Sequence, residues 1–452
     1  MTEKSLIIKP MMTFLVPVIF ASVLQSLGQV FGIIVVGQTL GVDALAAISA
    51  FFPLFFFLVS FAIGIGSGSS ILVGQTYGGG NIAKMKEVVG VTVSFTLVVS
   101  GAVAIFGSIF AENVLEWMGT PENILDESVG YARILFITLP ITFVYMVYTT
   151  FMRGVGDSKT PFYFLVISTV LNIILLPILI FGWFGLPEFG LNGAAYASVV
   201  SGLLTLILLL LYLQKKDHVL KLDSIVFLHF KLKGSVLKNL LRLAIPTIVS
   251  MVTIAMSEIA VVAYVNDYGS NATAAYGIVN QIASYVQIPA MSISIAVSVF
   301  VAQAIGSGKF ADIKQVTKTG ITLNYVLGGL LVLIVYVVAG PMLSVFTDHE
   351  ETRDIGRSLI VISFWSYVLL GHTQAISATM RATGTVLWPT LFTIMSILFI
   401  QVPGAYYMSH FTELGIKGIW LAYPMAFLFN LLAQSAYSHF VWKKKAMKAL
   451  LN

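Results

Sequence analysis

The sequence predicts an all-α integral membrane protein whose twelve transmembrane helices form two six-helix parallel repeats. Three observations lead to this prediction. Only 10% of the 452 residues are charged and 58% are hydrophobic, whereas roughly 25% of residues are charged in a typical soluble domain. Apolar runs of about 20 residues, each long enough to cross a bilayer as a helix, recur from end to end. The second half of the chain also repeats motifs of the first half.

The apolar runs define the expected spans. We place them at residues 13–38, 45–72, 88–110, 130–152, 161–183, 191–213, 241–265, 273–302, 319–343, 357–380, 388–408 and 416–441. The first run has span length and no small-residue cleavage pattern after it. We therefore expect it to be kept as a helix rather than removed as a signal peptide.

The basic residues fall mainly on one side of this topology. When the connections are numbered alternately from the N-terminus, 21 of the 25 Lys and Arg lie on the first side, and the other side carries only Arg133, Arg353, Arg357 and Lys417. The positive-inside rule then places both termini in the cytoplasm. Topology accounts for the net charge of +5, so we expect a lipid bilayer around the chain and no nucleic-acid partner.

An internal repeat becomes visible when the chain is shifted by about 228 residues. Segments that coincide are Val73–Lys86 with Val301–Lys314 ("VGQTYGGGNIAKMK" and "VAQAIGSGKFADIK") and Met152–Pro161 with Met380–Pro389 ("MRGVGDSKTP" and "MRATGTVLWP"). Each repeat has six spans, an even number, so both copies have the same orientation in the membrane. Parallel repeats of this kind are typical of transporters that work by rocking one half against the other.

The longest polar stretch divides the chain into three parts. We expect an N-lobe at 1–214, a basic cytoplasmic linker at 215–239 and a C-lobe with a basic tail at 240–452. Within the linker, "SIVFLHF" (Ser224–Phe230) has the pattern of a short amphipathic piece on the membrane surface. An ordinary cytoplasmic linker explains the same residues equally well.

Several classes of function are excluded or disfavoured by the residues. The chain has no cysteine, which excludes disulfides, thiolate metal sites and cysteine nucleophiles. The segment "GIGSGSS" (Gly64–Ser70) lacks the Lys and the preceding strand of a phosphate loop, and its small residues suit close helix packing. No His, Asp or Glu cluster suggests an enzyme, a bound metal or a cofactor. Without a nucleotide motif, the energy for transport must come from an ion gradient or from the gradient of the substrate.

At these motifs the chain resembles a known family. The segments "MRGVGDSKTP", "LNIILLPILIFG" (Leu171–Gly182) and "GLNGAAYAS" (Gly190–Ser198), together with the opening of the first span, Leu15–Gly41, are similar to the multidrug and toxic compound extrusion family, MATE, over essentially the whole chain. The resemblance implies two lobes around a central cavity. It also implies export of amphipathic, often cationic compounds in exchange for H⁺ or Na⁺.

Two positions depart from the family pattern. Many bacterial members carry an Asp in the first span where this chain has Gly32, and another in the fifth span where it has Leu176 before Pro177. These acids are linked to cation coupling in the N-terminal lobe of those members. Their coupling mechanism therefore cannot be carried over to this chain.

Glu258 is the only acid well inside any expected span. A charged group in the bilayer core costs a few kcal/mol, so such a residue is expected to face the bundle interior and to mark an ion or substrate path. The alternative is a neutral Glu hydrogen-bonded to a neighbouring helix. We predict that Glu258 couples transport to the cation. His372, in the tenth span, is a second ion-coupling candidate because histidine can titrate near neutral pH.

The candidate substrate-binding residues are polar or aromatic side chains within the spans. Amides inside hydrocarbon need partners, which are either the substrate or other helices, and aromatic faces can receive a lipophilic cation. The candidates are Gln25, Gln29, Tyr148, Asn172, Asn280, Gln281, Tyr285, Trp365 and Gln374. For each of them, interhelical bonding or ordinary span filling is the competing explanation.

The sequence thus predicts a monomeric secondary antiporter in a bacterial cytoplasmic membrane, exporting amphipathic cationic drugs without a cofactor. A flippase for a lipid-linked precursor is the alternative within transport, but it would favour basic residues in the middle of spans, and none occurs there. A membrane scaffold without transport is the alternative from another class. The rocking repeat argues against a scaffold.

Overall fold

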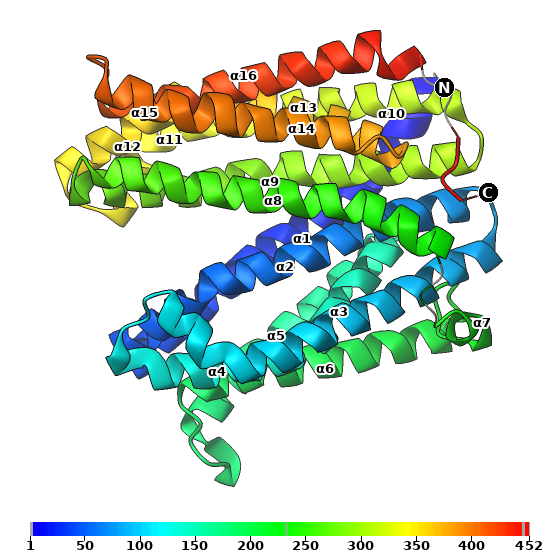
Figure 1. The fold of residues 1–452 in the computed structure, drawn as a ribbon, viewed down its shortest axis with the longest axis horizontal. Coiled ribbons are helices and arrows are strands. Elements are labelled where there is room, and N and C mark those ends of the chain that lie inside the picture. The colour runs from blue at the N-terminus through cyan, green and yellow to red at the C-terminus, as the bar shows by residue number, and fades with distance from the viewer. Residues whose placement is uncertain (1–2, 231, 233, 445–447, 452) are drawn as a thin grey trace. The chain divides into compact units, whose positions relative to one another are not determined.

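The computed structural model describes residues 3–230, 232, 234–444 and 448–451, and every regular element in this part of the chain is a helix (Figure 1). The first half contains α1 (Glu3–Leu40), α2 (Val42–Gly78), α3 (Ile82–Trp117), α4 (Glu122–Gly154), α5 (Lys159–Phe181), the short η1 (Trp183–Gly185) and α6 (Leu191–Lys215). A five-residue helix, α7 (Ser224–Leu228), lies in the linker.

The second half repeats this order with more breaks. It contains α8 (Gly234–Asn266), α9 (Ser270–Gly306), α10 (Phe310–Leu323), η2 (Asn324–Gly328), α11 (Gly329–Phe346), α12 (Glu350–Ser363), α13 (Trp365–Ala382), α14 (Leu387–Ser396), η3 (Ile397–Gln401), α15 (Val402–His410), α16 (Ile416–Phe440) and η4 (Trp442–Lys444). Eleven helices in the described residues are long and apolar enough to cross a membrane, and α12 with α13, bent by 44°, passes the same test when the pair is counted as one span. The predicted all-α fold is confirmed, with eleven or, counting the bent pair, twelve apolar spans.

Paired glycines show how closely the two halves share their turns. Glycine alone tolerates positive φ without steric cost, so each such residue marks a required backbone shape. The four pairs have nearly equal φ values: Gly41 and Gly269 (87° and 90°), Gly80 and Gly308 (71° and 72°), Gly156 and Gly384 (91° and 84°), and Gly190 and Gly415 (54° and 53°). The first three pairs keep the 228-residue shift of the sequence. The duplication therefore extends to the backbone conformation of the turns.

Three spans of the second half are broken where those of the first half are continuous, and one of them is the α12–α13 pair, whose counterpart α4 is a single helix. In the second half, η2 interrupts the third span and η3 interrupts the fifth, and both segments are π-helical. The corresponding α3 and α5 are continuous. A π-helical turn carries a wider hydrogen-bonding loop than its neighbours and is rare.

The described chain forms two compact units, each with its own apolar core. One unit runs from Phe20 to Ala244, and the other runs from Ile245 to Leu450 and includes the N-terminal stretch that ends at Ile19. Both boundaries fall inside a long helix, close to its internal proline: Pro17 in α1 and Pro246 in α8. Both cores contain large buried aromatic side chains, with Phe51, Phe136 and Phe143 in the first unit and Tyr276, Phe364 and Trp420 in the second.

Candidate cation-coupling site

Glu258 lies on the inward face of α8. Val261 and Val265 follow it by three and seven residues, on the same side of the helix, and both are fully buried in the core of their unit. Met256 and Ile259, on other sides of the helix, are about two-thirds exposed. The pattern of α8 therefore turns the acid away from the lipid, as a charged group in a span requires.

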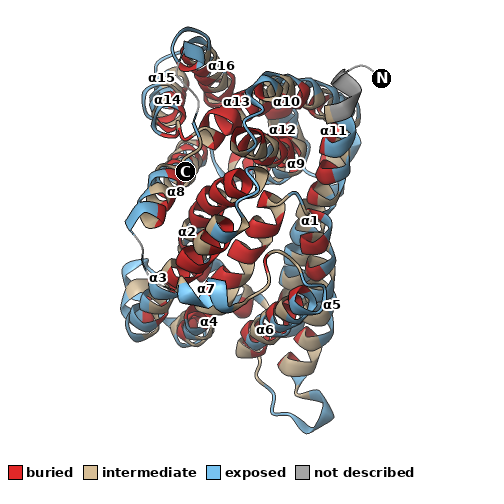
Figure 2. Cartoon of the chain, turned by 90° about the vertical axis from the view of Figure 1, so that its right-hand side faces the viewer, coloured by how far each residue is buried: buried red, intermediate tan, exposed pale blue. Residues whose placement is uncertain are grey.

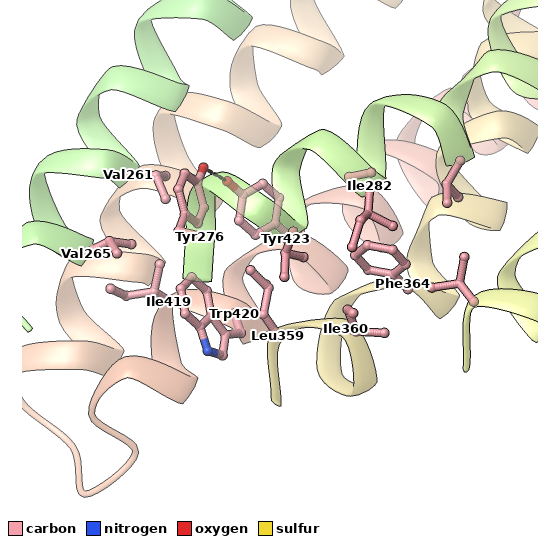
Figure 3. Close-up of a cluster of buried hydrophobic side chains, with 14 of the residues drawn as sticks. Val261, Val265, Tyr276, Ile282, Leu359, Ile360, Phe364, Ile419, Trp420 and Tyr423 are labelled. Carbon is pink, nitrogen blue, oxygen red and sulfur yellow. Dashed lines mark hydrogen bonds between the residues drawn. The ribbon is translucent and has the colours of Figure 1, made fainter. Parts of the chain in front are cut away.

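Two tyrosines from other helices meet this carboxylate. Tyr276 of α9 donates a hydrogen bond from its hydroxyl to Glu258 Oε2 at 2.6 Å. Tyr423 of α16 lies 3.2 Å from the same oxygen. The two hydroxyl oxygens are 2.6 Å apart, as the dashed line in Figure 3 shows. Three oxygens from three helices thus form a closed triangle.

Packing holds the two tyrosines in place. Both rings are buried, and Tyr276 stacks on the fully buried Trp420 with 5.9 Å between ring centroids and 7° between ring planes. Tyr423 meets Phe427 edge to face at 6.1 Å. The side chain of Asn280, one turn after Tyr276, lies close to both Glu258 and Tyr276. The polar triangle is therefore set in an aromatic wall with one amide beside it.

The number of hydrogens available for hydrogen bonding shows that the triangle can take up a proton. Three oxygen–oxygen contacts need three hydrogens, and each tyrosine hydroxyl supplies one. With an ionised carboxylate the triangle has two hydrogens. A proton on Glu258 supplies the third, so that every edge can carry one hydrogen bond. The arrangement can thus accept one proton without moving a side chain.

Several predicted residues of the second half lie elsewhere. His372 of α13 pairs with Tyr325 of η2, with 3.0 Å between Nδ1 and the hydroxyl. Trp365 is exposed and its indole nitrogen donates to the carbonyl of Ile362 at 2.8 Å. Gln281 is exposed, while Tyr285 and Gln374 are half-buried. Of the predicted set, only Asn280 joins Glu258, and the assigned roles stay predictions.

The predicted residues of the first half have different surroundings. Asn172 donates to Ser198 Oγ at 3.3 Å and to Ser201 Oγ at 3.4 Å, which matches the interhelical alternative. Tyr148 is buried and packs edge to face on Phe151. Gln25 and Gln29 are exposed on α1. Roles in substrate binding stay predictions for these residues as well.

Gly32 and Leu176, the two positions where many bacterial family members carry an Asp, have different surroundings. A Cβ at Gly32 would meet nothing within 4 Å. Leu176 is buried in an apolar cluster that includes Val36 and Ala194. In the described residues no group of three or more His, Cys, Asp or Glu could hold a metal ion.

Sequence reasoning did not connect either Tyr276 or Tyr423 with Glu258. Both are ordinary span residues in the sequence, 147 positions apart. Only the fold brings them together, and no local pattern could have identified the pair.

Comparison with known proteins agrees with this architecture. The sequence model of the MatE family matches residues 17–178 and again 246–407. Over 443 residues the chain is 53% identical to the "Probable multidrug resistance protein YoeA" of Bacillus subtilis (strain 168), with 98% of this chain and 96% of the relative covered.

A more distant relative and a solved structure extend the comparison. The chain is 26% identical over 386 residues to the "FAD transporter" of Shewanella oneidensis, covering 85% of this chain and 84% of that protein. A crystal structure of a mutant of the Vibrio cholerae MATE transporter VcmN superposes with a TM-score of 0.90 at 18% identity, covering 98% of this chain and 99% of the other. The chain belongs to the MatE family of multi-pass membrane transporters.

Proposed function

We propose that the protein is a multidrug exporter of a bacterial cytoplasmic membrane that exchanges amphipathic, cationic compounds for protons by alternating access. The name of the 53% identical relative, a probable multidrug resistance protein, supports the substrate class. The distribution of Lys and Arg supports cytoplasmic termini. Residues 1–214 and 240–452 are the proposed transport lobes, joined by the 215–239 linker, and the chain acts as a monomer without a cofactor.

We base the choice of a proton rather than Na⁺ on the oxygen triangle formed by Glu258, Tyr276 and Tyr423. One proton gives each of the three edges a hydrogen. A sodium ion would need the lone pairs of all three oxygens turned toward it, which breaks the bonds along the triangle. The short Tyr276–Tyr423 contact would then be lost first.

Exchange follows from competition for one negative charge. The proton-free carboxylate attracts a cationic substrate, and the aromatic side chains around it can receive the apolar part. A proton on Glu258 removes that charge and weakens binding of the cation. Protons entering from the outer side thus displace the drug outward, and drug binding from the inner side favours proton release.

Reconstitution tests this proposal directly. Efflux of a cationic dye from proteoliposomes is measured under a proton gradient alone and under a sodium gradient alone. We expect the proton gradient to drive efflux by the wild type and the sodium gradient to be ineffective. Glu258→Gln keeps the size and the hydrogen bonding but cannot titrate, so it should fold and lose driven efflux. Wild-type efflux by that variant across roughly pH 6 to 8 would contradict the coupling role.

A further inference from the structure

We propose that residues 224–230, together with Leu232, form a membrane anchor that lies in the boundary between headgroups and acyl chains of an anionic leaflet. This segment contains α7 and follows α6 through a short turn. Its large apolar side chains point outward: Phe227 is 57% exposed, Leu228 68% and Leu232 51%. The exposed face of α7 is pale blue in Figure 2.

The position of α7 along α3 sets its depth. Val226 packs so closely on α3 that a Cβ at Gly90 would lie 2.6 Å from the Val226 carbonyl oxygen. Gly90 lies about two turns after Ile82, where α3 begins. A helix of 36 residues is about 54 Å long and the hydrocarbon core is about 30 Å thick. A centred α3 therefore projects by about 12 Å at each end. Gly90 then lies close to the edge of the hydrocarbon, and α7 lies beside the span rather than beyond it (Figure 1).

Polar contacts fix the rotation of α7. Asp223 accepts hydrogen bonds at 3.1 Å from the backbone nitrogens of Ile225 and Val226, and its other oxygen pairs with Lys86 of α3. Gln214, near the end of α6, donates to the Leu222 carbonyl at 2.6 Å. Val226 is fully buried under these constraints. The side chains of Phe227 and Leu228, which follow Val226, therefore point away from the rest of the protein.

The charges around the segment match an anionic lipid surface. Lys215 and Lys216 are exposed just before it, and Lys231 and Lys233 flank Leu232 in the sequence. Apolar side chains between lysines are the pattern of interfacial segments, in which the apolar part enters the acyl boundary and the ammonium groups reach phosphates. A protein partner would also fit an apolar face, but it gives no reason for this depth.

The absence of native cysteines makes the depth measurable. A nitroxide is placed at Leu228→Cys, and as the matched control at Ser307→Cys, an exposed residue in the polar turn after α9. Each full-length variant is reconstituted in vesicles of phosphatidylcholine alone or with phosphatidylglycerol. Collision rates are then measured with oxygen, which concentrates in acyl chains, and with a water-soluble nickel chelate.

We expect the label at 228 to collide several-fold less with nickel and more with oxygen than the label at 307. The difference should be largest with phosphatidylglycerol. Equal nickel collision at both sites would overturn the anchor, since α7 would then lie in water. Shielding from both reagents would also overturn it, because it would mean a protein contact. A signal independent of phosphatidylglycerol would overturn the role of anionic headgroups.

Discussion

Gly371 of α13 packs directly against Asn324 of η2: a Cβ at position 371 would lie 1.9 Å from Asn324 Oδ1. The amide cannot turn away freely, because Asn324 Nδ2 donates to the Val368 carbonyl at 2.9 Å. Asn324 itself is 1% exposed. The glycine on one helix therefore makes room for the amide of the π-helical turn on another.

Gly371→Ala should destabilise the protein through this contact. Overpacking of this kind costs about 1–3 kcal/mol, so we expect a lower thermal unfolding midpoint for the purified protein in detergent. Gly329→Ala is the control, because a Cβ there would meet nothing within 4 Å. Equal midpoints for the two variants would mean that the helices can separate at no cost.

Tyr423→Phe should alter the pH dependence of efflux while leaving folding intact. The ring remains, but the carboxylate of Glu258 loses one hydroxyl donor. Hydrogen bonds to either protonation state favour that state, and both states of the triangle use this hydroxyl, so its loss should shift the pH midpoint of efflux. Tyr264→Phe on α8, whose ring packs on Tyr406, should leave the profile unchanged. A profile unchanged in Tyr423→Phe would remove the triangle from the coupling step.

The first half should tolerate an added acid at one position and reject it at the other. The wild type should transport without an acid in the first half. Gly32→Asp has free space around its Cβ and should be produced at the wild-type level. Leu176→Asp places a carboxyl in an apolar cluster and should cost about 3 kcal/mol or more. Leu176→Met is the size-matched control, and yields in detergent-solubilised membranes give the comparison. If the wild type were inactive and efflux appeared only in the Gly32→Asp variant, this chain would be a copy that has lost its transport activity.

The Lys86–Asp223 pair should hold α7 at every pH the cytoplasm reaches. Although burial disfavours the charged form of Asp223, the Lys86 ammonium and the backbone nitrogens of Val226 and Ile225 lower its pKa below the ordinary 3.8. A carboxyl with a lowered pKa stabilises the contact above its unfolded pKa and loses that contribution only as pH falls below about 4.

Nitroxide mobility at Leu228→Cys reports on this contact. It should be constant between about pH 5 and pH 8 and should rise when Lys86→Met is added, since the carboxylate then has no ammonium partner. A mobility that changed within that pH range would point to a different titrating group. No change on adding Lys86→Met would mean that the other contacts suffice.

The orientation of the chain can be tested from both faces of intact cells. A cysteine replacing Asp348, in the exposed turn before α12, should react with an impermeant maleimide added outside. A cysteine replacing Lys216, after α6, should react only once the membrane is opened. Labelling of position 348 from the cytoplasmic side alone would reverse the proposed topology.

The fold was predictable from the sequence because it depends on local and repeated signals. Runs of apolar residues define the spans, and glycines such as Gly80 and Gly308 mark equivalent turns. The site was only half predictable. An acid among apolar residues identified Glu258, because the physical cost of its charge is visible in the sequence. Its partner Tyr423 is one tyrosine among eighteen, and only the packing of α16 against α9 selects it.

The π-helical turns of the second half also record how its sequence has diverged from the first. A π turn holds one more residue than an α turn, while the 228-residue shift is the same before and after η2, at Gly80–Gly308 and Gly156–Gly384. Each extra residue rotates everything beyond it by about 100° of helical phase. We therefore expect side chains after η2 and η3 to point in other directions than those at the equivalent positions of the continuous α3 and α5. Substitutions copied between the halves by sequence register alone will therefore place side chains on the wrong face of these two spans.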